Sequence, residues 1–225
     1  MAVHPLVIDL SHWDPAHDFR AVKAGGYVGV IFKATQSTSL RDDRYVAQHR
    51  LAKQAGLKWG SYHFADRTNP TLQAENYLRF ASPNPDELFA LDWEEYGANT
   101  MSAYQVMAWV DKVESELGRP GQCVVYGPQH FLAQLYAPHF SFGARRTWVA
   151  RYGVQPALPR PYWLWQFTDG EVGPPPHTVP APCPASDIAT STPTPEPRTS
   201  SRPSGPRAAF KSISRSSTQQ IGGRL

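Results

Sequence analysis

The sequence has 225 residues, of which 41% are hydrophobic and 12% aromatic, so the chain can form a hydrophobic core and is not disordered throughout. Its formal net charge of +3 comes from the C-terminal end, since residues 183–225 carry six basic and two acidic side chains. Residues 1–182 are nearly neutral, whereas a nucleic-acid-binding domain carries a basic face. The charge distribution therefore argues against nucleic acid as a partner. Two cysteines, Cys123 and Cys183, are too few for a disulfide framework or a Cys-rich zinc site.

Short apolar and β-branched runs alternate with helical patterns over the first part of the chain. The runs predict strands at Leu6–Asp9, Val28–Lys33, Leu57–Tyr62, Leu88–Trp93, Cys123–Tyr126, Trp148–Ala150 and Tyr162–Phe167. The helical spacing predicts helices at Phe19–Ala24, Asp42–Ala55, Thr71–Ala81, Ser102–Leu117 and Gln129–Leu135. This alternation favours an α/β fold, a barrel of parallel strands with helices outside and few helices in its second half.

The composition changes after the last predicted strand. Eleven of the 22 prolines fall between residues 174 and 206, and the segment from Thr190 to Ser217 is rich in Ser, Thr, Pro and Arg. Such a composition buries too little apolar surface to offset its ordering entropy. We therefore expect one folded domain over residues 1–188 and a disordered tail over 189–225.

Carboxylates follow two of the predicted strands. Asp92 and Glu94 come directly after the apolar run Leu88–Leu91, and because side chains two apart point to the same face, Trp93 should point the other way. Asp9 ends the first strand, so all three carboxylates are expected at the same mouth of the barrel. Because they repel one another there, the pKa of at least one of them should rise, as a general acid requires. The alternative is that Glu94 opens a solvated loop and Asp9 caps a turn.

Aromatic residues gather at the same strand ends, where they could stack on sugar rings or simply fill the barrel. They are Tyr62, His63, Tyr126, Trp148, Trp163 and Trp165. Gln166, a polar residue between two aromatic ones, is expected to be either a buried hydrogen-bond partner or a sugar contact. Cys123 lies in an apolar strand and is expected in the core.

Other chemistries lack their motifs. The eight histidines show no zinc-binding spacing, and there is no nucleophile elbow, phosphate-binding loop or dinucleotide fingerprint, so no metal or cofactor is expected. No secretory signal is visible at the N-terminus, and no apolar run has the roughly 18 residues of a membrane span. We therefore expect a soluble monomer that does not insert into membranes and is cytoplasmic until its release.

The chain resembles the glycoside hydrolase family 25 lysozymes, which are N-acetylmuramidases. The matching segments are IDLSHWD (8–14), GVIFKATQ (29–36), GLKWGSYHFA (56–65), AENYLRF (74–80), LFALDWE (88–94), VVYGP (124–128), TWVARYG (147–153) and LWQFTDG (164–170). The resemblance implies an irregular, TIM-barrel-like (β/α) barrel of about eight strands and five helices. It also implies hydrolysis of the β-1,4 bond from N-acetylmuramic acid to N-acetylglucosamine in bacterial peptidoglycan, as in an endolysin.

The resemblance also assigns roles to residues. Glu94 would be the general acid/base, Asp92 would support the reacting centre by orienting the substrate's 2-acetamido group, and Asp9 would be the acid of the first strand. Tyr62, Tyr126 and Trp148 would line the cleft. Lys33, in the second segment, and Gln166 are further candidates for substrate binding.

The C-terminal end departs from the family pattern. A further Asp usually follows the Trp-Gln strand within a Gly-Ile and Asp-Ile-Asn context, and here only Asp187-Ile188 is present. Asp187 is thus a candidate fourth acid. The alternative function is a peptidoglycan-binding module that has lost turnover together with this ending, although the retained Asp9, Asp92 and Glu94 favour an enzyme.

Overall fold

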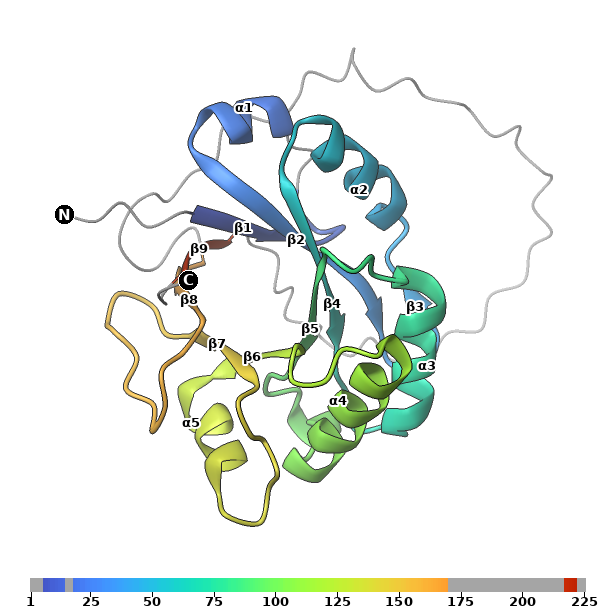
Figure 1. Ribbon diagram of the computed structural model, residues 1–225, viewed down its shortest axis with the longest axis vertical. Coiled ribbons are helices and arrows are strands. Elements are labelled where there is room, and N and C mark those ends of the chain that lie inside the picture. The colour runs from blue at the N-terminus through green and yellow to red at the C-terminus, as the bar shows by residue number, and fades with distance from the viewer. Residues whose placement is uncertain (1–5, 15–17, 170–216, 222–225) are drawn as a thin grey trace, which may run out of the picture.

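The computed structural model describes residues 6–14, 18–169 and 217–221, which form a curled sheet with helices packed outside it (Figure 1). The described strands are β1 (Leu6–Leu10), β2 (Tyr27–Gln36), β3 (Leu40–Arg41), β4 (Lys58–Phe64), β5 (Leu88–Asp92), β6 (Val124–Pro128), β7 (Arg146–Ala150), β8 (Leu164–Thr168) and β9 (Ser217–Ile221). Their order is β1-β9-β8-β7-β6-β5-β4-β2-β3, and β1 also pairs with β2, which closes the sheet on itself. The predicted irregular barrel is confirmed.

The helices connect successive parallel strands in the first part of the barrel. They are α1 (Phe19–Ala24), α2 (Tyr45–Gln54), α3 (Pro70–Ala81), α4 (Ala103–Leu117) and α5 (Gln129–Leu132), with 3-10 turns at Gly97–Asn99 and Ala133–Tyr136. Each predicted strand and helix is present with its ends within about three residues of those expected. Residues 151–163, between β7 and β8, contain no helix, which confirms the helix-poor second half. No helix among the described residues is long and apolar enough to cross a membrane.

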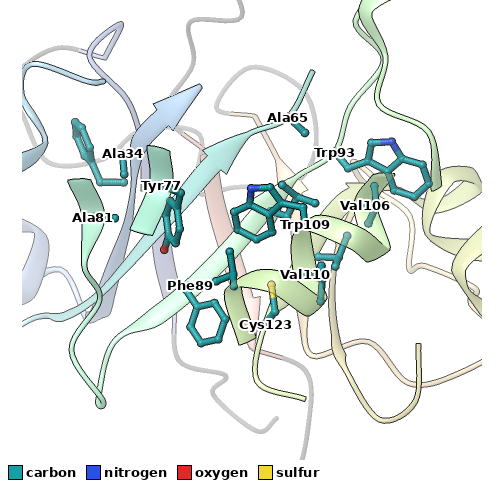
Figure 2. Packing of buried hydrophobic residues seen from close by; sticks show 14 of the residues in the cluster. Ala34, Ala65, Tyr77, Ala81, Phe89, Trp93, Val106, Trp109, Val110 and Cys123 are labelled. Carbon is teal, nitrogen blue, oxygen red and sulfur yellow. The ribbon is translucent and has the colours of Figure 1, made fainter. Parts of the chain in front are cut away.

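Successive side chains of a strand point to opposite faces of the sheet, so alternate residues pack into two separate cores. The residues Val7, Ile31, Ala90, Val124, Tyr126, Trp148 and Leu164 pack together inside the barrel. The opposite faces of the strands pack against the helices. There the ring centres of Tyr77 in α3 and Trp109 in α4 lie 5.4 Å apart (Figure 2). Cys123 is buried in this outer core, as predicted.

An irregularity in β2 changes which face its residues present. The register with β4 shifts between Lys33 and Thr35. Lys33 therefore lies on the side of the acidic residues at the barrel mouth, whereas the Thr35 hydroxyl bonds the ring of His63, which stacks on Trp109 in the outer core. A bulge of this kind re-aims a side chain without ending the strand.

Two strands were not predicted, the two-residue strand β3 and the C-terminal strand β9. Ser217–Ile221, within the segment expected to be disordered, forms β9 and pairs antiparallel with both β1 and β8. The run Ser-Thr-Gln-Gln-Ile lacks the apolar alternation on which strand prediction depends. Other residues of the expected tail lie outside the described residues, as do Asp187 and Cys183.

Candidate active site

The predicted acidic pair lies at the C-terminal end of β5, and Asp9 lies near the end of β1. Asp92 is buried and Glu94 is half-buried, while Trp93 between them packs in the outer core and donates a hydrogen bond from Nε1 to the Met101 carbonyl at 2.7 Å. The predicted opposite orientation of Trp93 is thus confirmed. Burial raises the pKa of Tyr62, and the charges of Asp92, Asp9 and Glu94 raise it further, so all three acids act on the same tyrosine.

The environments of the Asp92 and Glu94 carboxyls favour their protonated forms. Burial raises the pKa of Asp92 well above its usual value, the charges of Glu94 and Asp9 add to this, and Lys33 opposes it. Burial also raises the pKa of Glu94, against a hydrogen bond with Tyr126 and the charge of Lys33. Asp92 Oδ1 is buried and has no hydrogen-bond partner among the residues that the structure describes, so it can accept a bond from a ligand.

Lys33 is a buried cation beside these acids. Its Nζ donates to Gln36 Oε1 at 2.6 Å and lies 4.9 Å from the centre of the Phe64 ring. Burial lowers the pKa of Lys33, whereas the charges of Asp92, Asp42 and Glu94 raise it. An ammonium in this position stabilises the ionised forms of the neighbouring carboxyls.

Gln166 connects the first strand to two tyrosines. Its Nε2 donates to Asp9 Oδ1 at 3.3 Å, and its Oε1 accepts from the Tyr126 hydroxyl at 2.7 Å and from the Tyr152 hydroxyl at 3.3 Å. Of the two interpretations of Gln166, the structure shows the buried hydrogen-bond partner. Tyr152 was not predicted, although it lies within the segment TWVARYG.

The predicted aromatic residues divide between the two sides of the sheet. Tyr62 is half-buried, and Tyr126 and Trp148 are buried inside the barrel with ring centres 4.5 Å apart. Trp148 Nε1 is a second buried polar atom without a partner in the described part of the chain. His63 and Trp165 pack against the outer core, so their expected place at the mouth was wrong.

The turn after β1 adds residues that the sequence did not single out. Asp42 accepts hydrogen bonds from both the backbone nitrogen and the Nδ1 of His12, at 3.0 and 2.8 Å. The next residue, Trp13, is 58% exposed and lies 4.5 Å from the His12 ring. Trp13 is thus an exposed aromatic ring beside the His12 ring that contacts Asp42. Within the described residues, no group of three His, Cys, Asp or Glu side chains could hold a metal ion.

Comparison with known proteins identifies relatives of this chain. The family model described as glycosyl hydrolases family 25 matches residues 8–174. Lysozyme M1 of Streptomyces globisporus is 28% identical over 184 residues, which are 74% of this chain and 63% of that protein. The autolytic lysozyme of Clostridium acetobutylicum is 30% identical over 167 residues, which are 72% of this chain and 50% of that protein. The chain thus spans under two thirds of both relatives.

Among solved structures, a family 25 glycosyl hydrolase from Bacillus anthracis superposes with a TM-score of 0.66 at 20% identity. The match covers 75% of this chain and 82% of that one. At this identity the similarity supports the fold alone.

Proposed function

Because the chain belongs to glycosyl hydrolase family 25, we propose that it is an N-acetylmuramidase that hydrolyses the β-1,4 bond from N-acetylmuramic acid to N-acetylglucosamine in bacterial peptidoglycan. One observation carries the proposal. A half-buried glutamate with a raised pKa, Glu94, stands beside a buried aspartate, Asp92, that has an oxygen without a partner among the described residues.

Glu94 is the general acid in this proposal. A carboxyl whose burial raises its pKa holds its proton to a higher pH than a solvated glutamate does, and it can donate this proton to the glycosidic oxygen as the bond to the leaving sugar breaks. The resulting carboxylate then removes a proton from the water that attacks the anomeric carbon. The general acid of the first step thus becomes the general base of the second.

Asp92 orients the reacting sugar. Its Oδ1 accepts a hydrogen bond from the N–H of the 2-acetamido group, so that the acetamido oxygen faces the anomeric carbon and attacks it as the glycosidic bond breaks. The cyclic intermediate is opened by water in the second step. The charge of Lys33 opposes the rise in the pKa of Asp92 that burial and the neighbouring acids cause.

The bond that is cut identifies the activity. Purified peptidoglycan should be digested and its soluble products reduced and analysed by mass spectrometry. N-acetylmuramic acid at the reducing ends is the expected result, and N-acetylglucosamine at the reducing ends would contradict the proposal. Cosedimentation of the inactive Glu94→Gln variant with insoluble peptidoglycan measures binding separately.

The alternative is a binding module without turnover. It predicts cosedimentation of the unmodified protein and no new reducing ends after long digestion. The clustered acids argue against it, because grouping Asp9, Asp92 and Glu94 costs electrostatic free energy that sugar binding alone does not require.

A further inference from the structure

Trp93 lies in the chain between the two acids that the proposed reaction uses, and its side chain points away from them. The indole is 2% exposed and packs in the outer core, to which Val106 of α4 also belongs (Figure 2). Its Nε1 donates to the Met101 carbonyl at 2.7 Å, and its ring centre lies 4.8 Å from that of Phe131. The indole is therefore held by a hydrogen bond as well as by packing.

The backbone at the end of β5 is bonded to both neighbouring strands. The Asp92 carbonyl accepts a hydrogen bond from the Ala65 nitrogen at 2.9 Å. The Trp93 nitrogen donates to the Tyr126 carbonyl, also at 2.9 Å. A Cβ added at Gly127 would lie 2.5 Å from the Trp93 carbonyl oxygen, so β6 can approach this closely only because it has a glycine there. The backbone of Trp93 is thus closely packed against β6.

Glu94 follows this anchored residue and lies outside the strand. β5 ends at Asp92, and among the described residues the backbone of Glu94 makes no hydrogen bond with another backbone group. The chain returns to the outer core at Met101, which is 1% exposed. The bond from Trp93 Nε1 to the Met101 carbonyl therefore closes a loop over residues 93–101, in which Glu94 is the first residue after the indole.

Other hydrogen bonds of this loop hold its later residues. The Tyr96 nitrogen donates to Thr100 Oγ1 at 2.8 Å, and the Asn99 carbonyl accepts from the Arg67 nitrogen at 2.7 Å. The bonds of Trp93 are the ones adjacent to Glu94. Because a misplacement of about 1 Å at a reacting group can cost roughly 100-fold in rate, these bonds can affect catalysis without touching the substrate.

We propose that Trp93 is a positioning residue of the active site, whose indole N–H binds the Met101 carbonyl, closes the loop over residues 93–101 and thereby holds Glu94 in place for proton transfer. This inference rests on the proposed role of Glu94 as general acid. Trp93 acts through the backbone, because its ring lies in the outer core on the other side of the sheet from the acids. Loss of the N–H should therefore lower kcat and leave KM nearly unchanged.

The test removes the indole N–H and keeps an aromatic ring in the core. In the full chain, Trp93→Phe should lower kcat on soluble peptidoglycan fragments by about 10-fold or more, with KM changed by less than about 2-fold. Replacement of Trp93 by benzothienylalanine, which keeps two fused rings and lacks the N–H, is the second variant if Trp93→Phe does not fold. An unchanged kcat in the folded variant overturns the proposal.

Trp59→Phe is the matched control. Trp59 is also buried in the outer core, at 3% exposure, and its Nε1 donates to the Tyr45 hydroxyl at 3.4 Å. It lies near the start of β4, at the opposite end of the strand from the barrel mouth. Both variants lose a buried hydrogen bond, so the melting temperature should fall in both, whereas kcat should fall in Trp93→Phe alone. An equal fall of kcat in the two variants would show a general loosening of the core and overturns the proposal.

The Glu94 carboxyl provides a measurement that does not need turnover. Burial raises the pKa of Glu94, so a carboxyl released toward solvent in Trp93→Phe should have a pKa lower by about half a pH unit or more. The pKa is read from the side-chain carboxyl resonance in a 13C NMR titration of protein labelled at glutamate, assigned with Glu94→Gln. The titratable groups that face Glu94, unchanged in this variant, are Asp92, Lys33, Tyr62, Tyr126 and Tyr152.

The two measurements distinguish this inference from the proposed function. The same pKa of Glu94 in Trp93→Phe and in the unmodified protein overturns the role of Trp93, whether or not the protein hydrolyses peptidoglycan. A lowered pKa in a protein whose unmodified form releases no reducing ends supports the positioning role and contradicts the proposed function.

Discussion

Glu94 and Glu95 are adjacent and chemically alike, yet only Glu94 is half-buried among the acids, and Glu95 is exposed. Glu94→Gln removes the transferable proton and keeps the shape, so we expect the rate of peptidoglycan hydrolysis to fall by about 100- to 10,000-fold. Binding to insoluble peptidoglycan and the melting temperature should change little. Glu95→Gln is the control and should retain activity. An active Glu94→Gln variant together with an inactive Glu95→Gln variant would mean that the other face of the strand carries the catalytic residues.

Lys33 was expected to bind substrate, and its position gives it a second role that pH dependence can distinguish. Its ammonium opposes the raised pKa of both Asp92 and Glu94. Lys33→Met should therefore raise the pKa of Asp92 further, and the acidic limb of the kcat/KM profile should move to higher pH by about one unit or more. Lys58→Met, at an exposed site on β4, is the control. A raised KM with an unmoved acidic limb would instead support direct substrate binding.

The acids of the site could be predicted from the sequence, but their connections could not. Asp92 and Glu94 follow from one strand and its alternation, a local pattern. The bond from Gln166 to Asp9 joins residues 157 positions apart, and that from Tyr126 to Gln166 spans 40 positions. Such pairs depend on strand order and register, which the apolar pattern of an individual strand does not specify.

A buried polar network ties β2, β4 and α3 together behind the barrel. Gln73 Oε1 accepts from the backbone nitrogen of Asp66, so His63 Nε2, 3.0 Å away, is the donor to the same oxygen. The other ring nitrogen, Nδ1, then accepts from the Thr35 hydroxyl at 2.7 Å. These partners match a neutral imidazole that donates from Nε2 and accepts at Nδ1.

The burial of His63 makes the fold sensitive to acid. Burial, with a smaller contribution from the charge of Lys33, lowers the pKa of His63 to about 4, against hydrogen bonding to Gln73 and the charge of Asp66. The unfolded chain, with a histidine pKa near ~6.5, binds a proton that the folded chain does not over the interval between these values. The stability contributed by neutral His63 is thus present above about pH 6.5 and is lost as the pH falls toward 4.

The measurement is urea unfolding at pH 7 and pH 4.5. Relative to a His63→Gln variant, the unmodified protein should lose about 2 to 3 kcal/mol more between the two pH values. His130→Gln, at an exposed histidine, should lose as much as the unmodified protein. Equal losses in all three proteins would show that His63 does not titrate on unfolding.

The helices and parallel strands were predictable because their signals are local. Helix α4, for example, begins at a Ser102–Gln105 capping box and ends at Gly118 in the left-handed conformation, both legible in the sequence. Two features had no such signal. The two-residue strand β3 is too short for periodicity, and the shift between Lys33 and Thr35 arises from pairing with β4.

Closure of the barrel depends on β9, one of the two strands that the sequence did not reveal. In the order β1-β9-β8, the backbone of β9 pairs with both neighbours, Ser217 opposite Asp9 and Gln219 opposite Gln166. β9 therefore joins β1 and β8 at the same residues, Asp9 and Gln166, whose side chains are hydrogen-bonded. This links the C-terminal end of the chain to the geometry of the candidate site.

Deletion of residues 217–225 tests this link. Without β9, the facing edges of β1 and β8 lose their ladder bonds, and unpaired strand edges are costly to leave in a folded barrel. We expect the melting temperature in calorimetry to fall by about 5 °C or more, which corresponds to roughly 2 kcal/mol for a domain of this size. Activity on peptidoglycan should fall as well, because Asp9 and Gln166 lose their common support. Deletion of residues 222–225 alone leaves β9 in place and should change neither quantity. If both truncated proteins melt at the same temperature as the full chain, β9 does not hold the barrel closed.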